Sequence, residues 1–480
     1  MSVAAILGGG IAGLSTAYYL TRTAQQAFKR IILIEGSNHL GGWIKSVRQD
    51  NGAVFEHGPR SLRGSGQAGI NALELAEDLG LESKIIAVPR SRPAAQNRFI
   101  YVNNKIHILP NSFKSLVRKT EPFDKAFIRY LINDLITKGK RNGEDETIYD
   151  FVARRLGSDM ANYAIDPLCR GVYAGDAKQL SIKSTFHDLW KFEQENGGII
   201  KGALIGEKQK VQSISPLVER SKKERWAIWS LDNGIQGIPD RMVDVLNAEP
   251  NVEIMTETKC TDLDLSGPRV KVTCDNSEIL EVDHVFSTLP AMNLSPAVST
   301  NHQLLSSELS KIPYVDVAVV NVELKGQVMP FLGFGHLIPS TENSKVLGIV
   351  YDSCNFPEHD RKDQPSTRLT CMMGGAWFRQ LFGDPETANL DTFTDLALEA
   401  VREQMGITAD PSEVCTTLQR NCIPQYVIGH SQVMDNINGY LESHKLPLSL
   451  LGASYKGVSV NDCIYHAKLE VERVTGETLP

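Results

Sequence analysis

Residues 6–20, ILGGGIAGLSTAYYL, place a glycine-rich turn between an apolar run and a helical pattern. The run Val3–Leu7 is continuous, as in a parallel strand buried on both faces, and Ile11, Leu14 and Tyr18 then recur at helical spacing. The turn, Gly8-Gly9-Gly10-Ile11-Ala12-Gly13, has the pattern G-x-G-x-x-G. At such a turn the first N–H groups of the helix are unpaired and suit a pyrophosphate. The sequence therefore predicts that these six residues bind a dinucleotide.

The glycines and the next strand have separate expected roles. Gly8 allows the tight turn, Gly10 lets a phosphate approach the main chain, and Gly13 lets the helix pack closely on the sheet. A second apolar run, residues 31–34, ends at Glu35, where a carboxylate can bind ribose hydroxyls. No Arg or Lys follows Glu35 within the next several residues, so NADP is disfavoured and NAD or FAD remain. The alternative is a glycine turn with a structural role only.

Composition narrows the possible partners. The chain has 480 residues, 42% hydrophobic content and a net charge of -7, which predicts two or three domains and, without a long basic block, no nucleic-acid partner. The eight cysteines are dispersed, so we expect buried thiols and no metal site. No run approaches the roughly eighteen apolar residues of a transmembrane helix. Because the first strand begins at Val3, we expect no cleavable leader and an internal organelle address.

Two further glycine segments favour FAD. The segment Gly41-Gly42-Trp43 lies shortly after Glu35, and Glu56-His57-Gly58-Pro59-Arg60 follows it. Paired glycines there let a loop cross close to the pyrophosphate and to the bulky isoalloxazine. In these residues the chain resembles the FAD-dependent amine-oxidase superfamily, in which an L-G-G segment and an E-x-G-P segment contact the flavin. The resemblance implies FAD as the cofactor.

Four longer segments are similar to those of the protoporphyrinogen oxidase family of the animal mitochondrial type. They are residues 93–99 (PAAQNRF), 168–175 (LCRGVYAG), 334–337 (FGHL) and 452–463 (GASYKGVSVNDC), in the expected order. The resemblance implies an α/β fold in which a Rossmann-like FAD-binding domain is interleaved with a mixed β-sheet substrate domain and a helical membrane-associated domain. The implied FAD-binding domain comprises residues 1–92, 211–300 and 425–480, the substrate domain residues 93–109 and 301–424, and the helical domain residues 110–210.

A second flavin contact is expected far along the chain. Ser459 fits the cap of a helix that begins at Val460 and ends near Gly476, and the positive N-terminus of this helix suits a flavin edge that becomes anionic on reduction. The alternative is an ordinary capped helix on the sheet. Through the resemblance, the further predicted FAD contacts are Gly41, Gly42, Trp43, Gly58, Pro59, Arg60, Ser61, Lys259, Ala453, Val458, Ser459 and Val460.

Two of these assignments carry qualifications of their own. Lys259 would contribute its main chain on the adenine side, and Arg60 would support the cofactor loop or, alternatively, form a structural salt bridge. Monoamine oxidases tether flavin through a C-terminal cysteine and cage amines between paired aromatics. Neither feature has a counterpart around residues 452–460, where Tyr455 is a lone aromatic. We therefore expect non-covalent FAD.

The predicted substrate pocket depends on the resemblance. Residues 99–109 read as a hairpin with an Asn-rich turn, and Arg98 stands at its entrance. Its planar guanidinium could pair with a propionate, although without the resemblance it reads as a solvated surface charge. A carbonyl such as that of Gly335 could accept pyrrole N–H bonds. The implied apolar wall comprises Leu168, Phe334, Gly335, Leu337, Leu347, Val350 and Met372, each of which is plain core by composition alone.

The implied activity is the oxidation of protoporphyrinogen IX to protoporphyrin IX in haem biosynthesis. Six hydrogens leave in three two-electron steps, with hydride passing from a meso carbon to flavin N5, and dioxygen regenerates the flavin as hydrogen peroxide forms. Hydride transfer chiefly requires positioning, and no residue is assigned as a catalytic base. The alternatives are a flavin amine oxidase, in which an amine and not a porphyrinogen bleaches the flavin, and a non-catalytic carrier of the prenylated-GTPase escort type, which lacks a flavin spectrum.

Residues 110–206 have a helical pattern, in which Phe123, Phe127, Leu131 and Leu135 form one apolar stripe. From the sequence alone this stripe favours a core-facing helix over a membrane-surface helix. The resemblance reverses that preference. It implies a peripheral protein of the mitochondrial inner membrane, on the intermembrane-space side, with a homodimer as a possible assembly.

Overall fold

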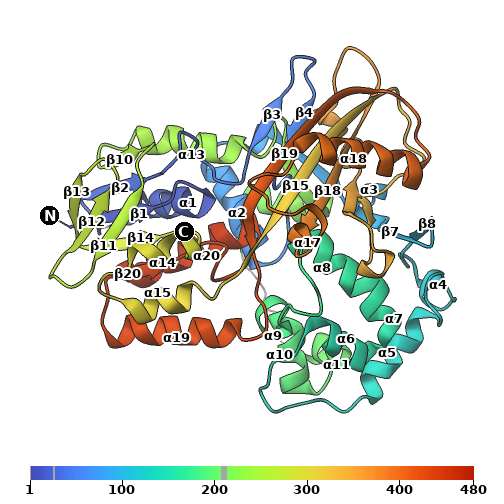
Figure 1. Ribbon diagram of the computed structural model, residues 1–480, viewed down its shortest axis with the longest axis horizontal. Helices are drawn as coiled ribbons and strands as arrows, with labels where there is room; N and C mark the ends of the chain where they lie inside the picture. Colours follow the sequence, from blue (N-terminus) through green and yellow to red (C-terminus); the bar gives the residue numbers. More distant parts are fainter. Residues whose placement is uncertain (1, 25–26, 207–212, 480) are drawn as a thin grey trace.

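The computed structural model of the protein describes residues 2–24, 27–206 and 213–479, which form a mixed α/β fold with several β-sheets (Figure 1). The predicted α/β class is therefore confirmed. Two sheets, one of five strands and one of seven, organise the molecule, and a group of helices lies beside them. Within the described residues, no helix combines the length and apolarity needed to cross a bilayer.

The five-stranded sheet is parallel, and its strand order is β10-β2-β1-β14-β20. Its members are β1 (Val3–Leu7), β2 (Arg30–Ile34), β10 (Val252–Met255), β14 (His284–Ser287) and β20 (Leu448–Leu450). They come from all three segments assigned to the FAD-binding domain. Alternate residues of β1 and β2 point to opposite faces of the sheet and enter two different hydrophobic cores. The first core also contains residues of α1 (Ile11–Thr21), α2 (Gln67–Asp78), α13 (Gly237–Asn247) and α20 (Val460–Thr475). The second core contains residues of α14 (Ala291–Ala297), α15 (Gln303–Leu309) and α19 (His430–Ser443). Burial on both faces explains the continuous apolar runs.

The seven-stranded sheet has the order β19-β15-β18-β17-β16-β7-β8. Its strands are β7 (Phe99–Val102), β8 (Lys105–Ile108), β15 (Tyr314–Lys325), β16 (Gly335–Leu337), β17 (Val346–Val350), β18 (Ser366–Gly375) and β19 (Pro411–Pro424). One face packs on α18 (Leu390–Met405) and α17 (Phe378–Phe382). The predicted hairpin is confirmed, since Asn103 and Asn104 connect β7 and β8 with positive φ angles of 52° and 59°, the conformation of a two-residue I′ turn.

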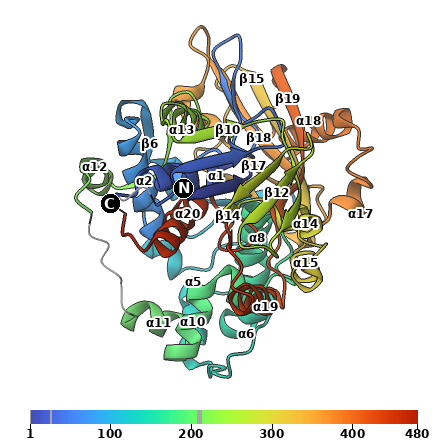
Figure 2. The same ribbon diagram turned by 90° about the vertical axis from the view of Figure 1, so that its left-hand side faces the viewer.

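The helical region lies below both sheets in the two views (Figures 1 and 2). Its members are α4 (Phe113–Leu116), α5 (Phe127–Ile136), α6 (Ile148–Leu156), α7 (Ser158–Met160), α8 (Asp166–Tyr173), α9 (Ile182–Thr185), α10 (His187–Asn196) and α11 (Ile199–Ile205), with a π-helical turn at Ala161–Ile165. The remaining strands and α-helices are β3 (Ser46–Arg48), β4 (Val54–Glu56), β5 (Leu62–Arg63), β6 (Ile85–Pro89), α3 (Pro93–Gln96), α12 (Pro216–Glu224), β9 (Trp226–Leu231), β11 (Cys260–Asp264), β12 (Val270–Cys274), β13 (Ile279–Val282) and α16 (Asp352–Asn355).

The predicted apolar stripe of residues 123–135 is wrong in two respects. Phe123 lies ahead of α5, where it is buried in the core of the helical region, and Leu135 is 57% exposed, so the stripe does not continue along the buried face of the helix. The face that is buried carries Tyr130 and Asp134. Asp134 is turned inward because its carboxylate pairs with the buried guanidinium of Arg155 at 2.5 Å and accepts the N–H of Ile200 at 2.8 Å. The buried face of α5 thus carries a charge that is paired.

Candidate active site

The glycine turn after β1 is built as the sequence predicts. Gly8 has a φ of +99°, which favours glycine, and a Cβ on Gly13 would lie 1.9 Å from the Gly8 carbonyl oxygen. α1 has no side-chain cap, and within the described residues the amides of Ile11, Ala12 and Gly13 have no hydrogen-bond partner. The open N-terminus of this eleven-residue helix can therefore receive an anionic group.

Glu35 lies next to this turn. Its Oε2 accepts the N–H of Gly9 at 2.7 Å, and its Oε1 accepts the N–H and the hydroxyl of Ser37 at 2.9 and 2.8 Å. The side chain is half-buried, and these bonds fix its carboxylate beside the turn. A fixed, partly exposed carboxylate has lone pairs left for ribose hydroxyls.

The second and third glycine segments meet the first. The N–H of Gly41 donates to the Gly9 carbonyl at 2.9 Å, and a Cβ on Gly42 would lie 3.1 Å from the Gly10 Cα. A Cβ on Gly58 would lie 2.2 Å from the carbonyl oxygen of Trp43. Main chain approaches main chain at each of these positions. The three segments therefore form one cradle that side chains would fill.

The predicted far-end segment also reaches this cradle. A Cβ on Gly452 would lie 3.6 Å from the Cβ of Ala12, at the start of α1. Ser459 caps α20 as predicted, since its Oγ accepts the N–H of Asp462 at 3.2 Å, and Gly476 ends the helix with a φ of +73°. The segment that leads into α20 thus meets the start of α1.

Arg60 connects the cradle to the substrate sheet. Its Nη1 donates to the Oδ1 of Asp352 at 2.9 Å, and the Oδ2 of Asp352 accepts the hydroxyl of Thr370 on β18 at 2.7 Å. The salt bridge named as the alternative role of Arg60 is therefore present. Within the described residues, the buried Nη2 of Arg60 and the buried Nε2 of His57 have no partner. Unpaired polar atoms on both sides of Gly58 and Pro59 fit a polar group of a bound cofactor.

Residues 56–58 lie on one face of the seven-stranded sheet. Asn321 donates to the Glu56 carbonyl at 3.1 Å, Gln419 donates to the His57 carbonyl at 2.9 Å, and the His57 Nδ1 is 2.8 Å from the Thr417 hydroxyl. These contacts come from neighbouring strands, β15 and β19. The cofactor segment is thereby fixed on the face of the sheet that does not pack on α18.

The same face carries part of the predicted apolar wall. Val319 is paired with Thr417 on one side and with Met372 on the other, and Val319, Met372 and Leu347 belong to one apolar cluster. Val350 and Gly335 are paired across β17 and β16. The strand register thus places four of the predicted wall residues, Gly335, Leu347, Val350 and Met372, in the sheet that contacts residues 56–58.

The rest of the wall lies toward α8. A Cβ on Gly171 would lie 2.4 Å from the Leu337 Cδ2, so α8 packs directly on β16. Leu168 is on α8 and 37% exposed, and Phe334 lies just before β16. The structure places these side chains around the junction of sheet and helices.

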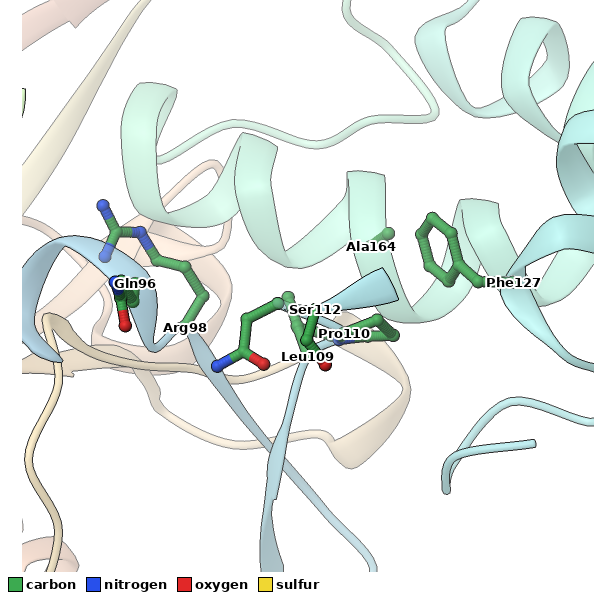
Figure 3. A pocket seen from close by; sticks show the side chains of 8 residues that line it. Gln96, Arg98, Leu109, Pro110, Ser112, Phe127 and Ala164 are labelled. Carbon is green, nitrogen blue, oxygen red and sulfur yellow. The ribbon is translucent and has the colours of Figure 1, made fainter. Parts of the chain in front are cut away.

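Arg98 lies at a cavity of about 480 Å³ (Figure 3). Its Nη1 donates to the Ala94 carbonyl at 2.7 Å, and its guanidinium is 4.6 Å from the centre of the Phe334 ring. Figure 3 shows Arg98 at one end and Phe127 of α5 at the other. The cavity is lined by Gln96, Arg98, Leu109, Pro110, Asn111, Ser112, Phe127 and Ala164. It therefore includes Arg98 but none of the seven predicted apolar wall residues.

Two titratable groups of the cofactor segment are perturbed. Burial raises the pKa of Glu56 to about 7, although its carboxylate accepts the Ser46 hydroxyl at 2.6 Å and the Ile235 N–H at 3.0 Å. Burial also lowers the pKa of His57, and the positive charges of Lys45 and Arg60 add to this effect. His57 is therefore neutral near pH 7.

Lys259 lies beside Gly36, the residue after Glu35. A Cβ on Gly36 would lie 2.8 Å from the Lys259 Cγ. The main chain of Lys259 is bonded to Asp275, whose Oδ1 accepts its N–H at 3.0 Å and whose N–H donates to its carbonyl at 2.9 Å. The contact of Lys259 with adenine stays a prediction, as do those of Ser61, Ala453 and Val458.

The sequence reasoning did not name several polar residues of this site. Asp352, Thr370, Asn321 and Gln419 connect the cofactor segment to the sheet through side-chain bonds. No motif marks Asp352, Asn321 or Gln419, because the residues of the cofactor segment that they contact are more than a hundred positions away in the chain. The one available signal is a carboxylate, Asp352, directly after the apolar run 346–351.

Comparisons with known proteins identify the family. The family model described as "Flavin containing amine oxidoreductase" matches residues 11–475. The chain belongs to this flavin-containing amine oxidoreductase family. Proteins named protoporphyrinogen oxidase from Macaca fascicularis and Homo sapiens are each 41% identical to this amine oxidoreductase over 472 residues, 98% of both chains. Cyclohexylamine oxidase from Brevibacterium oxydans IH-35A shares its fold with a TM-score of 0.68 and 13% identity over 99% of both chains.

These matches confirm the resemblance to the protoporphyrinogen oxidase family and FAD as the cofactor of this flavin-containing amine oxidoreductase. The residues present fit that cofactor. The open N-terminus of α1 suits the pyrophosphate, Glu35 suits a ribose, and the glycine cradle gives the main chain close access.

Proposed function

We propose that this flavin-containing amine oxidoreductase oxidises protoporphyrinogen IX to protoporphyrin IX in haem biosynthesis, with dioxygen as the final electron acceptor. The proposal depends on one observation, the 41% identity to two mammalian protoporphyrinogen oxidases over 98% of both chains. Identity of this extent leaves no insertion large enough to replace the substrate region. When bound, the flavin supplies a two-electron acceptor for hydride from the macrocycle.

The chain's own residues would bind and orient the two reactants. The amides at the start of α1 and the Glu35 carboxylate hold the cofactor's polar parts, and Arg60, paired with Asp352, fixes the loop that carries Gly58 against the sheet. The apolar cluster of Val319, Leu347 and Met372 excludes water beside that loop. Positioning the two reactants in this way lowers the activation barrier for hydride transfer, and no residue of the protein is assigned as a proton donor or acceptor.

Arg98 is the proposed propionate partner. Its guanidinium is held by the Ala94 carbonyl and by the ring of Phe334, one of the predicted wall residues, and it lines the cavity described above. A pre-positioned guanidinium loses little conformational freedom when it pairs with a carboxylate. The apolar wall would then hold the rest of the macrocycle, with the pyrrole N–H groups directed toward main-chain carbonyls such as that of Gly335.

The helical region supports a further part of the proposal, docking on the mitochondrial inner membrane from the intermembrane space. Two neighbouring helices, α5 and α11, expose apolar side chains: Ile128, Ile132, Leu135, Ile136, Leu204 and Ile205, each between 38 and 78% exposed. In α5 these residues follow the spacing i, i+4, i+7, i+8 and share one face. An exposed apolar face of this size suits an interfacial helix. A homodimer is compatible with this arrangement.

The decisive test is an absorption spectrum of the purified protein under anaerobic conditions. Protoporphyrinogen IX should bleach the bound flavin, whereas cyclohexylamine and benzylamine should not. Admission of air should restore the spectrum and yield three molecules of hydrogen peroxide for each protoporphyrin, because six hydrogens leave in pairs. Bleaching by an amine alone would favour an amine oxidase. Protein that is purified without a flavin spectrum would favour a carrier.

A relative named coproporphyrinogen III oxidase, from Bacillus subtilis, is 26% identical over 97% of this chain. Coproporphyrinogen III is therefore the second substrate to compare, since it carries four propionates where protoporphyrinogen IX carries two. The proposed function expects the higher kcat/KM with protoporphyrinogen IX.

A further inference from the structure

Tyr426 lies between the end of β19 and the start of α19 and reaches into the segment 452–459. Its hydroxyl donates to the Ala453 carbonyl at 2.5 Å and accepts the N–H of Gly457 at 2.9 Å. One phenol oxygen thus bridges an acceptor and a donor four residues apart on the same turn. Across the described residues, neither main-chain group has another hydrogen-bond partner.

The ring of Tyr426 is itself held in place. It is 4% exposed and stacks on the ring of His430, with 4.1 Å between the ring centres and 16° between the planes. Its main-chain carbonyl accepts the N–H of Ser181 from the helical region at 2.8 Å. The hydroxyl is therefore presented to the turn from a fixed position.

The turn needs such support because its conformation is unusual. Gly452 and Gly457 have φ angles of +93° and +90°. Within residues 452–457, all of which the structure describes, a single main-chain hydrogen bond forms, from the Tyr455 N–H to the Gly452 carbonyl at 3.2 Å. Glycines in this region leave the unbonded chain many alternative conformations. Two residues after Gly457, Ser459 begins the cap of α20.

We propose that Tyr426 is a positioning residue for the flavin: its hydroxyl holds the 453–457 turn in the shape that lets the segment 453–460 contact the cofactor. The inference rests on the proposed function through the predicted flavin contacts of Ala453, Val458 and Val460. Tyr426 acts through the turn, because its hydroxyl is already occupied by Ala453 and Gly457. It connects the cofactor segment to the helical region through Ser181.

The test compares Tyr426→Phe with Tyr455→Phe. The first change removes both bonds to the turn and almost no volume. The second is a matched control, since the Tyr455 hydroxyl is buried in the same turn and has no partner among the described residues. We expect FAD release from the purified holoprotein, followed by the recovery of free-flavin fluorescence after dilution, to be about tenfold faster for Tyr426→Phe. Release from Tyr455→Phe should match the wild type.

A rescue experiment distinguishes the loss of the two hydrogen bonds from a loss of packing around the Tyr426 ring. A 4-aminophenylalanine incorporated at position 426 keeps a donor and an acceptor, and it should restore slow release. Equal release rates for Tyr426→Phe and the wild type would overturn the inference. If Tyr426→Phe does not fold, amide exchange of the wild-type apoprotein decides: a Gly457 amide protected without FAD supports the inference, and an unprotected one overturns it.

These outcomes are independent of the substrate. FAD release requires no porphyrinogen, so unchanged release together with normal porphyrinogen oxidation contradicts the role of Tyr426 alone. Faster release from Tyr426→Phe in a protein that does not oxidise porphyrinogen contradicts the proposed function alone.

Discussion

The guanidinium of Arg60 lies 2.9 Å from the carboxylate of Asp352, and this ion pair joins the cofactor segment to the seven-stranded sheet. The two side chains are 10 and 12% exposed, and Thr370 bonds the second carboxylate oxygen. In an ion pair that is so little exposed, each charge stabilises the fold mainly because its partner would otherwise be buried without a counter-charge. It fixes the distance between the glycine cradle and the substrate side of the sheet.

Asp352→Ala should therefore destabilise the protein by about 3 to 5 kcal/mol and reduce its FAD content, because Arg60 is left buried without its partner. Thermal unfolding and the ratio of flavin to protein absorbance measure the two effects. The control is Glu253→Ala, which breaks the exposed pair with Arg30 and should cost less than about 1 kcal/mol. Equal losses in the two variants would contradict the role assigned to the buried pair.

Glu56 predicts a pH dependence of stability. Its folded-state pKa is raised from the usual 4.5 to about 7, so between these values the folded protein binds more protons than the unfolded chain. The unfolding free energy should therefore fall as pH rises through this window, by on the order of 3 kcal/mol for this group. Glu56→Gln should flatten the slope, measured as unfolding midpoints at about pH 5 and about pH 8. The exposed Glu253→Gln serves as control, and an unchanged slope in Glu56→Gln would count against the shift.

Gly13→Ala should abolish FAD binding or folding. A Cβ there would lie 1.9 Å from the Gly8 carbonyl oxygen, so the turn and α1 would have to separate. Gly439→Ala is the matched control, because Gly439 is also helical, in α19, and a Cβ would meet nothing within 4 Å. That change should stabilise the protein by up to about 1 kcal/mol through helix propensity. Flavin content and unfolding midpoint distinguish the two, and a Gly13→Ala protein with normal flavin content would refute the close approach.

The apolar face of α5 should bind lipid. Ile132→Asp combined with Leu135→Asp places two charges on the face proposed to enter the interface, and co-sedimentation with vesicles that contain cardiolipin should fall at least about tenfold. Leu304→Asp is the control, since Leu304 is 70% exposed on α15, away from the helical region. If Leu304→Asp lowers vesicle binding as much as the double variant does, the proposed face is wrong.

Arg98→Ala should raise the KM for protoporphyrinogen IX about tenfold while FAD content stays normal, because one charge-assisted contact to a propionate is lost. Arg98→Lys should recover only part of the affinity, since a point charge cannot reproduce a paired contact. Lys105→Ala, an exposed cation on the same hairpin, is the control. A KM unchanged in Arg98→Ala would remove Arg98 from the site.

Local patterns predicted the elements around the cofactor well. The strand Val3–Leu7, the cap at Ser459 and the Asn103-Asn104 turn were predicted because each depends on neighbours within a few residues. The order of the glycine segments and the family resemblance then located the cradle. The contact residues assigned through the resemblance remain predictions.

The features that the sequence did not predict are mostly polar contacts between residues that are far apart in the chain. The apolar pattern did not predict that Asp134 lies on the buried face of α5, because its partner Arg155 is on α6 and no helical periodicity contains it. Asp352 and Tyr426 were missed for the same reason, since their partners Arg60 and Ala453 are distant in the chain. Side-chain hydrogen bonds and ion pairs between remote segments depend on how the chain folds, and local patterns in a single sequence do not contain that information.

The interleaved sheet has a consequence for biosynthesis. β1 and β20 belong to one sheet although more than four hundred positions separate them along the chain, and α20 covers the helix that follows β1. The ribosome therefore exposes the first glycine turn long before the segment that completes it has been made. We expect the nascent chain to remain unable to retain its coenzyme throughout translation, so that loading follows release from the ribosome.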